Sequence, residues 1–262
     1  MRIVFVGAGN LATRLSLALR TAGHDIIQVY SRTMASAETL AVRLGCKATC
    51  SADEIDREAE VYIFSVKDNV LETLAAQIVP GREQALFLHT AGSMPLDVFK
   101  PWATRYGVCY PMQTFSKSRE VDFSEIPVFI EASGAVELAQ IERLAASVSG
   151  NVRELDTSRR RYLHLAAVFA CNFANHCYAL AEEILARHDI PFDVMLPLVK
   201  ETARKVEQLS PREAQTGPAV RYDENVINRQ AAMLADEPEW KNIYESMSHS
   251  IHRLALEKPD KS

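Results

Sequence analysis

A short glycine loop near the N-terminus has residue types and spacing suited to binding phosphate. Gly7-Ala8-Gly9-Asn10-Leu11-Ala12 fits the pattern G-x-G-x-x-A, directly after a strand-like apolar run and directly before a helix-like segment. Gly7 permits a tight turn, Gly9 lets the backbone approach a pyrophosphate, and Ala12 keeps helix and strand close. The helix N-terminus adds free N–H groups and a positive dipole. The loop predicts a dinucleotide site with contacts from Gly7, Gly9, Asn10 and Leu11; a purely structural glycine turn is the alternative.

The residues after the second predicted strand distinguish NAD from NADP. An acidic side chain there would hydrogen-bond the ribose 2′-hydroxyl and repel a 2′-phosphate. The chain instead reads Tyr30-Ser31-Arg32-Thr33, with a guanidinium and two hydroxyl groups that can donate hydrogen bonds to phosphate. This pattern predicts NADP(H) as the cofactor, bound by Ser31, Arg32 and Thr33. A solvated surface arginine is the alternative interpretation.

Three polar side chains on one long predicted helix could carry the chemistry that a nicotinamide cofactor supports. Hydride transfer to a carbonyl or imine needs a donor that protonates or stabilises the developing charge. At about 100° per residue, His164, Asn172 and Asn175 fall within about a quarter of the helix circumference. We therefore predict that His164 is a catalytic acid and that Asn172 or Asn175 orients the substrate. Paired polar groups in a helix–helix interface are the alternative.

The order of apolar runs predicts the elements that must position these residues. Strand-like and helical segments alternate from residue 2 to about residue 155, which is typical of a parallel, doubly wound Rossmann sheet. The predicted strands cover residues 2–6, 26–30, 61–66, 85–89, 107–110, 128–131 and 152–155. From Thr157 onward the periodicity is helical, with a long helix from Ser158 to about Arg187. We expect an α/β chain with a Rossmann domain at residues 1–155 and an all-α domain at residues 156–262.

Composition limits the classes of partner. The 262-residue chain is 48% hydrophobic and carries a formal net charge of -5, so it lacks the broad basic field that nucleic acid or an anionic membrane surface would attract. A small-molecule ligand is expected instead. The five cysteines have no close CxxC pair and no histidine at zinc-ligand spacing, so we expect no metal site.

Two further features concern location. Met1 leads directly into the first predicted strand, leaving no room for a signal peptide, which predicts a cytoplasmic protein. The most apolar long stretch, residues 163–181, contains His164, Asn172 and Asn175, which a membrane-spanning helix would carry only at high cost. We expect this stretch to be a core helix.

Several motifs resemble those of one family. They are the Gly7 loop, Val66-Lys67-Asp68, His89-Thr90-Ala91-Gly92-Ser93, Tyr110-Pro111-Met112-Gln113-Thr114-Phe115-Ser116 and Ala214-Gln215-Thr216-Gly217-Pro218-Ala219. Over nearly its whole length the chain resembles the Rossmann-like NADP oxidoreductases with a DUF2520 C-terminal domain. That architecture is similar to pyrroline-carboxylate reductases and β-hydroxyacid dehydrogenases, with a helical domain like the C-terminal fold of 6-phosphogluconate dehydrogenase.

The resemblance implies further site residues and a homodimer. It implies that Val66, Thr90 and Ala91 lie beside the nicotinamide and its ribose, although ordinary hydrogen bonding at a strand end would also explain Thr90. It implies that Gln215, Thr216 and Gly217 bind a substrate carboxylate or close the site, whereas a helix-breaking turn is the alternative. One departure is that β-hydroxyacid dehydrogenases carry a lysine four residues before the helix asparagine, where this chain has Val168.

Together these features predict an NADP-dependent oxidoreductase that transfers a hydride between NADP(H) and a small carbonyl, imine or hydroxy compound. The alternative is an NADP(H)-binding redox sensor or dimeric binding module without turnover. A polar cleft facing the nicotinamide would distinguish the enzyme from the sensor.

Overall fold

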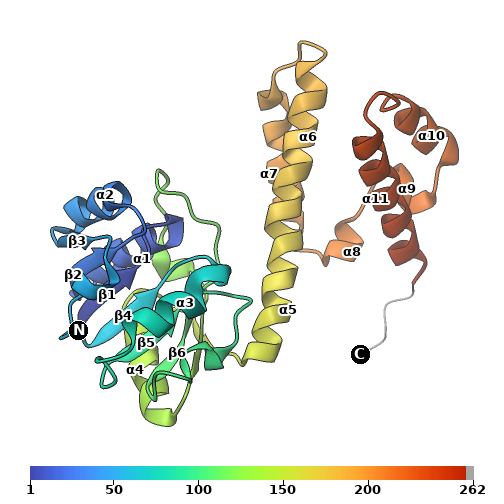
Figure 1. Ribbon diagram of the computed structural model, residues 1–262. Coiled ribbons are helices and arrows are strands. Elements are labelled where there is room, and N and C mark those ends of the chain that lie inside the picture. The colour runs from blue at the N-terminus through green and yellow to red at the C-terminus, as the bar shows by residue number, and fades with distance from the viewer. Residues whose placement is uncertain (258–262) are drawn as a thin grey trace. The chain divides into compact units, whose positions relative to one another are not determined.

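The structure is a computed structural model that describes residues 1–257 (Figure 1). The chain divides into two compact units, Met1–Asn172 and a second that begins at Phe173. The sequence predicted a division at residue 155, where strands give way to helices. The first unit also includes the helix that follows the last strand. We keep the division at residue 155 as a proposal for the boundary between the two domains.

An eight-stranded sheet forms the centre of the first unit. The strands are β1 (Arg2–Val6), β2 (Asp25–Tyr30), β3 (Lys47–Thr49), β4 (Val61–Phe64), β5 (Leu86–His89), β6 (Tyr106–Pro111), β7 (Val128–Ala132) and β8 (Val152–Glu154). Their order is β3-β2-β1-β4-β5-β6-β7-β8, which contains the Rossmann arrangement on both sides of β1. The predicted α/β fold with a doubly wound Rossmann sheet is therefore confirmed.

Two details of the sheet differ from the prediction. The short strand β3 was not predicted, and β7 runs antiparallel to β6 although the other neighbouring pairs are parallel. Parallel neighbours need a crossover connection, usually a helix. Between β6 and β7 the chain has only a short 3-10 helix, Phe123–Glu125, and it returns in the opposite direction.

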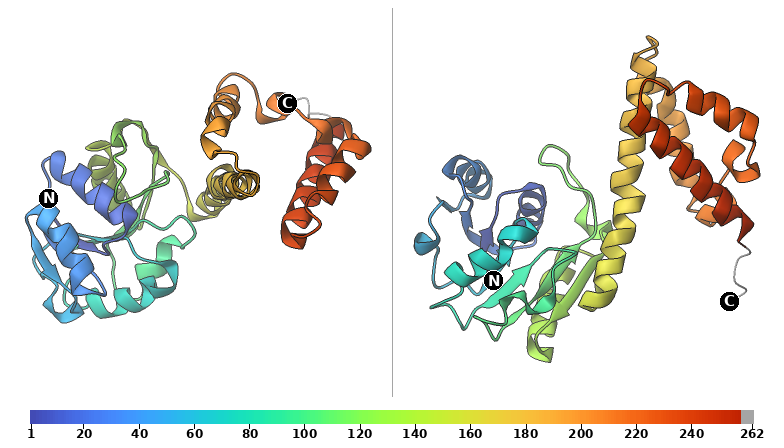
Figure 2. Two further views of the ribbon diagram at one scale, coloured as in Figure 1. Left: turned by 90° about the horizontal axis from the view of Figure 1, so that it is seen from above. Right: turned by 45° about the vertical axis from the view of Figure 1, so that its right-hand side comes forward.

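Helices cover both faces of the sheet, as Figures 1 and 2 show. On one face, α1 (Asn10–Thr21), α2 (Met34–Leu44) and α4 (Ala135–Ala146) pack on strand residues such as Ile3 and Phe5. On the other, α3 (Asp68–Ile78) and the 3-10 helix Leu96–Phe99 pack on alternate residues such as Val4 and Val6. This alternation follows from the period of two residues in a strand. It produces two buried apolar layers that hold the strand ends in place.

After the last strand, three helical segments follow one another without an intervening loop. Helix α5 (Thr157–Ala167) passes into a π-helical turn, Val168–Phe173, and then into α6 (Ala174–Ala186). The described part of the second unit is helical, and it contains α7 (Leu196–Lys205), α8 (Pro211–Ala214), α9 (Pro218–Arg221), α10 (Glu224–Ala232) and α11 (Pro238–Leu256). Within residues 1–257, no helix combines the length and apolar character needed to cross a bilayer.

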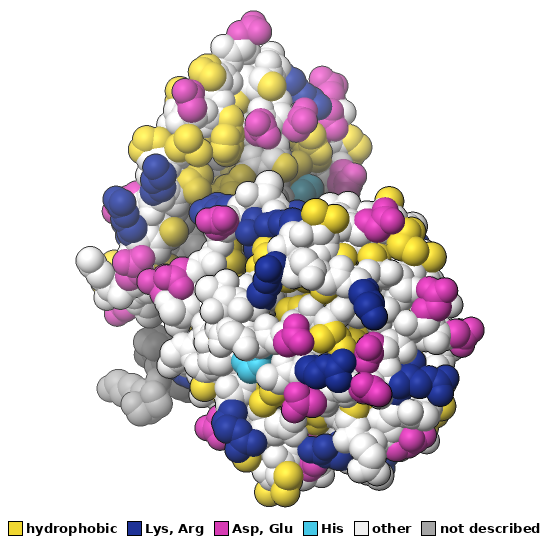
Figure 3. Space-filling model, turned by 90° about the vertical axis from the view of Figure 1, so that its left-hand side faces the viewer, with side chains coloured by type: hydrophobic (Ala, Val, Ile, Leu, Met, Phe, Trp, Pro, Cys, Tyr) yellow, Lys and Arg dark blue, Asp and Glu magenta, His cyan; other side chains and the backbone are white. Residues whose placement is uncertain are grey.

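Charged side chains of both signs are interspersed on the surface of the first unit. Figure 3 shows Lys and Arg beside Asp and Glu over the face of this unit that it presents. This mixture agrees with the small net charge of the chain.

Candidate active site

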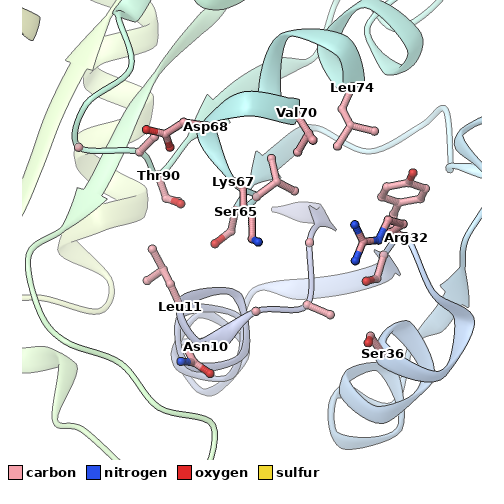
Figure 4. A pocket seen from close by; sticks show the side chains of 18 of the residues that line it. Asn10, Leu11, Arg32, Ser36, Ser65, Lys67, Asp68, Val70, Leu74 and Thr90 are labelled. Atoms are coloured by element: carbon pink, nitrogen blue, oxygen red, sulfur yellow. The ribbon is translucent and has the colours of Figure 1, made fainter.

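A cleft of about 760 Å³ lies at the carboxyl ends of β1, β2, β4 and β5 (Figure 4). Its size falls in the range of small-molecule and cofactor sites. Every predicted cofactor residue lines this cleft, namely Gly7, Gly9, Asn10, Leu11, Ser31, Arg32, Thr33, Val66, Thr90 and Ala91. His164 lines it as well. The position agrees with the rule that ligands of open α/β sheets bind outside the carboxyl ends of the strands.

The glycine loop leaves its outer side open. Gly7 has a φ of 120°, and a Cβ added there would lie 2.2 Å from the carbonyl oxygen of Ser65, so no other residue fits without movement. A Cβ added at Gly9 would meet no atom within 4 Å. The first turn of α1 has no acidic side chain. Backbone N–H groups at the start of α1 can therefore receive a phosphate without a competing negative charge.

Positively charged and hydroxyl side chains line the cleft near the end of β2. Thr33 precedes α2, and its hydroxyl donates to Ser36 Oγ at 2.9 Å. Figure 4 shows Arg32 on the β2 side and Lys67 on the β4 side of the opening. Within residues 1–257, neither cation forms an ion pair with a carboxylate. Both charges are thus available to a bound anion.

His164 and Tyr110 meet at another part of the cleft. The Tyr110 hydroxyl lies 3.0 Å from His164 Nδ1, and the two rings make an edge contact. Among the described residues, Nε2 of His164 has no hydrogen-bond partner. Burial raises the pKa of Tyr110, while the nearby Arg160 guanidinium acts in the opposite direction. The phenol therefore keeps its proton at neutral pH.

Gly92 allows the imidazole of His164 to approach the loop after β5. A Cβ at Gly92 would lie 2.6 Å from His164 Nδ1. Any side chain at this position would therefore displace the ring that contacts Tyr110.

The remaining predicted site residues do not line this cleft. Asn172 is exposed in the π-helical turn, and Asn175 is exposed on α6 in the second unit. The shared helix face predicted for them with His164 assumed regular α-helical spacing, which the π-helical turn interrupts. Gln215, Thr216 and Gly217 follow α8, and Thr216 lines an apolar groove within the second unit. The roles of these residues stay predictions.

The sequence analysis did not assign several residues that line the cleft: Ser36, Ser65, Lys67, Asp68 and Tyr110. A signal was present for some of them. Lys67 follows a predicted strand, and Tyr110 ends another, so both belong to the same sheet edge. Among the described residues, no cluster of three or more His, Cys, Asp or Glu could hold a metal ion.

The fold and the cleft define a Rossmann-type nucleotide-binding protein with a helical second unit. Residues 2–90 match the family described as NADP oxidoreductase, coenzyme F420-dependent, and residues 126–251 match DUF2520, a domain of unknown function. A Bacteroides fragilis protein described as a "putative NADP oxidoreductase" is 53% identical, with 96% of this chain and 98% of that chain covered and a TM-score of 0.94. The chain belongs to this family of NADP oxidoreductases with a DUF2520 domain, and the cofactor of the family is NADP(H).

More distant solved structures share the fold. A Thermotoga maritima protein is 22% identical, with 97% of this chain and 100% of that chain covered and a TM-score of 0.80. An imine reductase from Myxococcus stipitatus, solved with NADP+, is 15% identical over 97% of this chain and 93% of that chain, with a TM-score of 0.67. A search of curated proteins finds no match.

Proposed function

We propose that the chain is an NADP-dependent oxidoreductase that transfers a hydride between NADP(H) and a small carbonyl, imine or hydroxy compound. One observation carries the proposal: the glycine loop, Arg32 and the His164–Tyr110 pair line the same cleft. A cleft that combines phosphate-binding groups with a histidine and a tyrosine has the parts that nicotinamide chemistry requires.

Three groups of cleft residues would bind three different parts of the cofactor. The Gly7 loop and the N–H groups of α1 would hold the pyrophosphate. Ser31, Arg32 and Thr33 would hold the 2′-phosphate, with Ser36 beside them. Val66, Thr90 and Ala91 would line the nicotinamide half, which lies across the switch point of the sheet from the adenine half.

His164 is the proposed proton donor. Bound NADPH supplies a hydride to the carbon of the substrate C=O or C=N bond, and the oxygen or nitrogen then needs a proton. Nε2 of His164 can donate that proton, because the Tyr110 hydroxyl occupies the Nδ1 side of the ring. A protonated ring that gives up its Nε2 proton keeps the proton on Nδ1, so the Tyr110 hydroxyl accepts a hydrogen bond from Nδ1 both before and after the transfer.

Asn172, Asn175 and the segment Gln215–Gly217 complete the proposal as substrate residues. Their support is the sequence pattern and the family resemblance described above.

The second candidate is an NADP(H)-dependent sensor without turnover. Val168 favours it, because β-hydroxyacid dehydrogenases have a lysine at that place. The presence of His164 and Tyr110 in the nucleotide cleft favours the enzyme, since a sensor needs no proton donor there.

We also propose that the protein is a homodimer. The second unit exposes large apolar side chains, including Ile184 at 38%, Leu198 at 59% and Met247 at 50%. Exposed apolar surface on this scale is typical of an interaction face. The family resemblance implies a dimerisation role for the helical unit, which supports this proposal.

The test of the cofactor assignment is calorimetric titration of NADPH and NADH into the wild type and Arg32→Ala. The wild type should prefer NADPH, and Arg32→Ala should weaken NADPH binding by about 10- to 100-fold, because charge-assisted hydrogen bonds to the 2′-phosphate are lost. NADH binding should not change. Arg43→Ala, which removes an exposed arginine on α2 outside the cleft, is the matched control. If the wild type binds neither nucleotide, the proposed function is wrong.

A further inference from the structure

The loop after β5 forms one wall of the cleft, and a buried arginine holds it from behind. Thr90, Ala91, Gly92 and Ser93 line the cleft, whereas Arg160 does not. The Arg160 side chain is fully buried, with 0% of its surface exposed. Its Nη1 donates to three backbone carbonyl oxygens, those of Ala91 at 2.9 Å, Gly92 at 3.1 Å and Met94 at 2.8 Å. One cation therefore fixes the direction of three peptide groups in the loop.

The Glu131 carboxylate balances the positive charge of Arg160 at Nη2, the guanidinium nitrogen that does not contact the loop. Nη2 donates to Glu131 Oε2 at 3.1 Å and to Thr157 Oγ1 at 3.0 Å. The backbone N–H and the hydroxyl of Thr157 both donate to Glu131, and Thr157 Oγ1 accepts from Leu96 N. A buried charge persists only where it is paired and hydrogen-bonded. These contacts tie the loop to β7 and to the start of α5.

A neutral histidine holds the loop from a second direction. His89 Nδ1 accepts from the N–H of Ala91 at 3.2 Å, so the ring proton lies on Nε2, which donates to the carbonyl oxygen of Pro95 at 3.2 Å. Burial, together with the charge of Arg160, lowers the pKa of His89 to about 3. The ring therefore keeps one tautomer over the range of ordinary pH.

Arg160 and His164 are one helical turn apart on α5, so the helix joins the loop to the proposed proton donor. Gly92 is close to both side chains, since Arg160 donates to its carbonyl oxygen and a Cβ added at Gly92 would lie 2.6 Å from His164 Nδ1. Displacement of the loop would therefore change both the nicotinamide side of the cleft and the position of the His164 ring.

We propose that Arg160 is a positioning residue that holds the loop of residues 90–94 in the form that binds the nicotinamide half of NADP(H). This inference rests on the proposed function. A lysine could not replace the arginine, because it is a point charge without the planar fork that serves the loop carbonyls and Glu131 at once.

The geometry of the cleft provides a test that needs no substrate. In Figure 4, Thr90 and Arg32 lie on opposite sides of the cleft. A ligand with only the adenosine half, 2′,5′-ADP, would therefore contact the Arg32 side and not the loop. Titration of NADPH and 2′,5′-ADP into one variant separates an effect on the loop from general damage.

The experiment compares Arg160→Lys with Arg82→Lys. Arg82 is 6% exposed and also donates to backbone carbonyl oxygens, those of Ile55 at 2.6 Å and Ile78 at 2.7 Å, but it lies outside the cleft. Arg160→Lys should weaken NADPH binding by about tenfold, the loss expected when one hydrogen bond to a charged group is removed. It should change 2′,5′-ADP binding by less than about twofold, and Arg82→Lys should change neither affinity.

Glu131→Gln is the second variant, because it keeps the size of the side chain and weakens its pairing with Arg160. It should weaken NADPH in the same direction as Arg160→Lys, again without an effect on 2′,5′-ADP. Unchanged NADPH affinity in both variants, or an equal loss for the two ligands, would overturn the inference. A wild type that binds neither ligand would instead overturn the proposed function.

Discussion

A buried positive charge behind the cleft wall lies close to two side chains that stay neutral. Arg160 acts electrostatically on Tyr110 and on His89, favouring the ionised phenol and opposing the imidazolium. Burial opposes ionisation of both groups and determines the outcome for Tyr110. The phenol and the His89 ring therefore serve as hydrogen-bonding groups. The proton transfer is proposed for a different side chain, His164.

Replacement of His164 tests that role. With a panel of small cyclic imines and ketones, His164→Ala should lower kcat for NADPH oxidation by about 10²- to 10⁴-fold, the usual contribution of a general acid. NADPH affinity should change by less than about twofold. Tyr110→Phe should reduce kcat less, since the ring keeps Nε2 but loses its partner at Nδ1. His188→Ala, at an exposed histidine, is the control; equal turnover in His164→Ala would exclude His164 as the acid.

His89 predicts a loss of stability in acid. Its folded pKa of about 3 lies below the ordinary value of 6.5, so below pH 6.5 the unfolded chain binds a proton that the folded chain excludes. The contribution of His89 is present above pH 6.5 and is lost as the pH falls towards 3. Between about pH 7.5 and about pH 4.5 this linkage amounts to about 2–3 kcal/mol.

Urea unfolding at those two pH values measures this effect. The wild type should lose about 2 kcal/mol more than His89→Gln, which cannot take up the proton. His188→Gln, which changes an exposed histidine, should behave like the wild type. Equal losses in the wild type and His89→Gln would show that His89 becomes protonated without a penalty in the fold.

At the scale of elements, the helices and strands that have a clear local pattern of apolar residues could be predicted from the sequence. The first βαβ unit and its glycine loop were predicted because strand, turn and helix each have a pattern within about 20 residues. Strand β3 was missed because it has three residues and no alternation to detect. The antiparallel direction of β7 depends on the path of the chain after β6, and the π-helical turn after α5 has no signal in hydrophobic spacing.

The same distinction applies to the site. Gly7, Gly9 and Arg32 were predicted because each follows a strand within a recognisable local motif. Arg160 lies in an Arg-Arg-Arg run, a pattern that usually indicates a solvated helix start, although its side chain is fully buried. Its partner Ala91 is 69 residues away, and Tyr110 is 54 residues from His164. Contacts over such separations depend on the order of strands in the sheet, which a single sequence does not reveal.

At the scale of the whole molecule, the two units differ in how they bury apolar side chains. The first unit encloses two apolar layers around its sheet, and the core residues of β1 and β4 are almost completely buried. In the second unit, by contrast, few apolar side chains are fully buried, and many are exposed on α6, α7 and α11. An apolar groove of about 400 Å³ runs along side chains of α6 and α11, including Ile184, Trp240 and Met247. Such a unit has more apolar surface than it covers within one chain.

This imbalance leads us to expect a dimer of about twice the 29.2 kDa chain mass in light scattering coupled to size exclusion. Met247→Glu places a charge in the groove, where a contacting second copy would have to desolvate it, so the variant should elute as a monomer. Met233→Glu is the matched control, because Met233 is 80% exposed and lies outside the groove. A wild type of monomer mass would exclude the homodimer, whereas a dimer that persists in Met247→Glu would place the contact on another face of the helical unit.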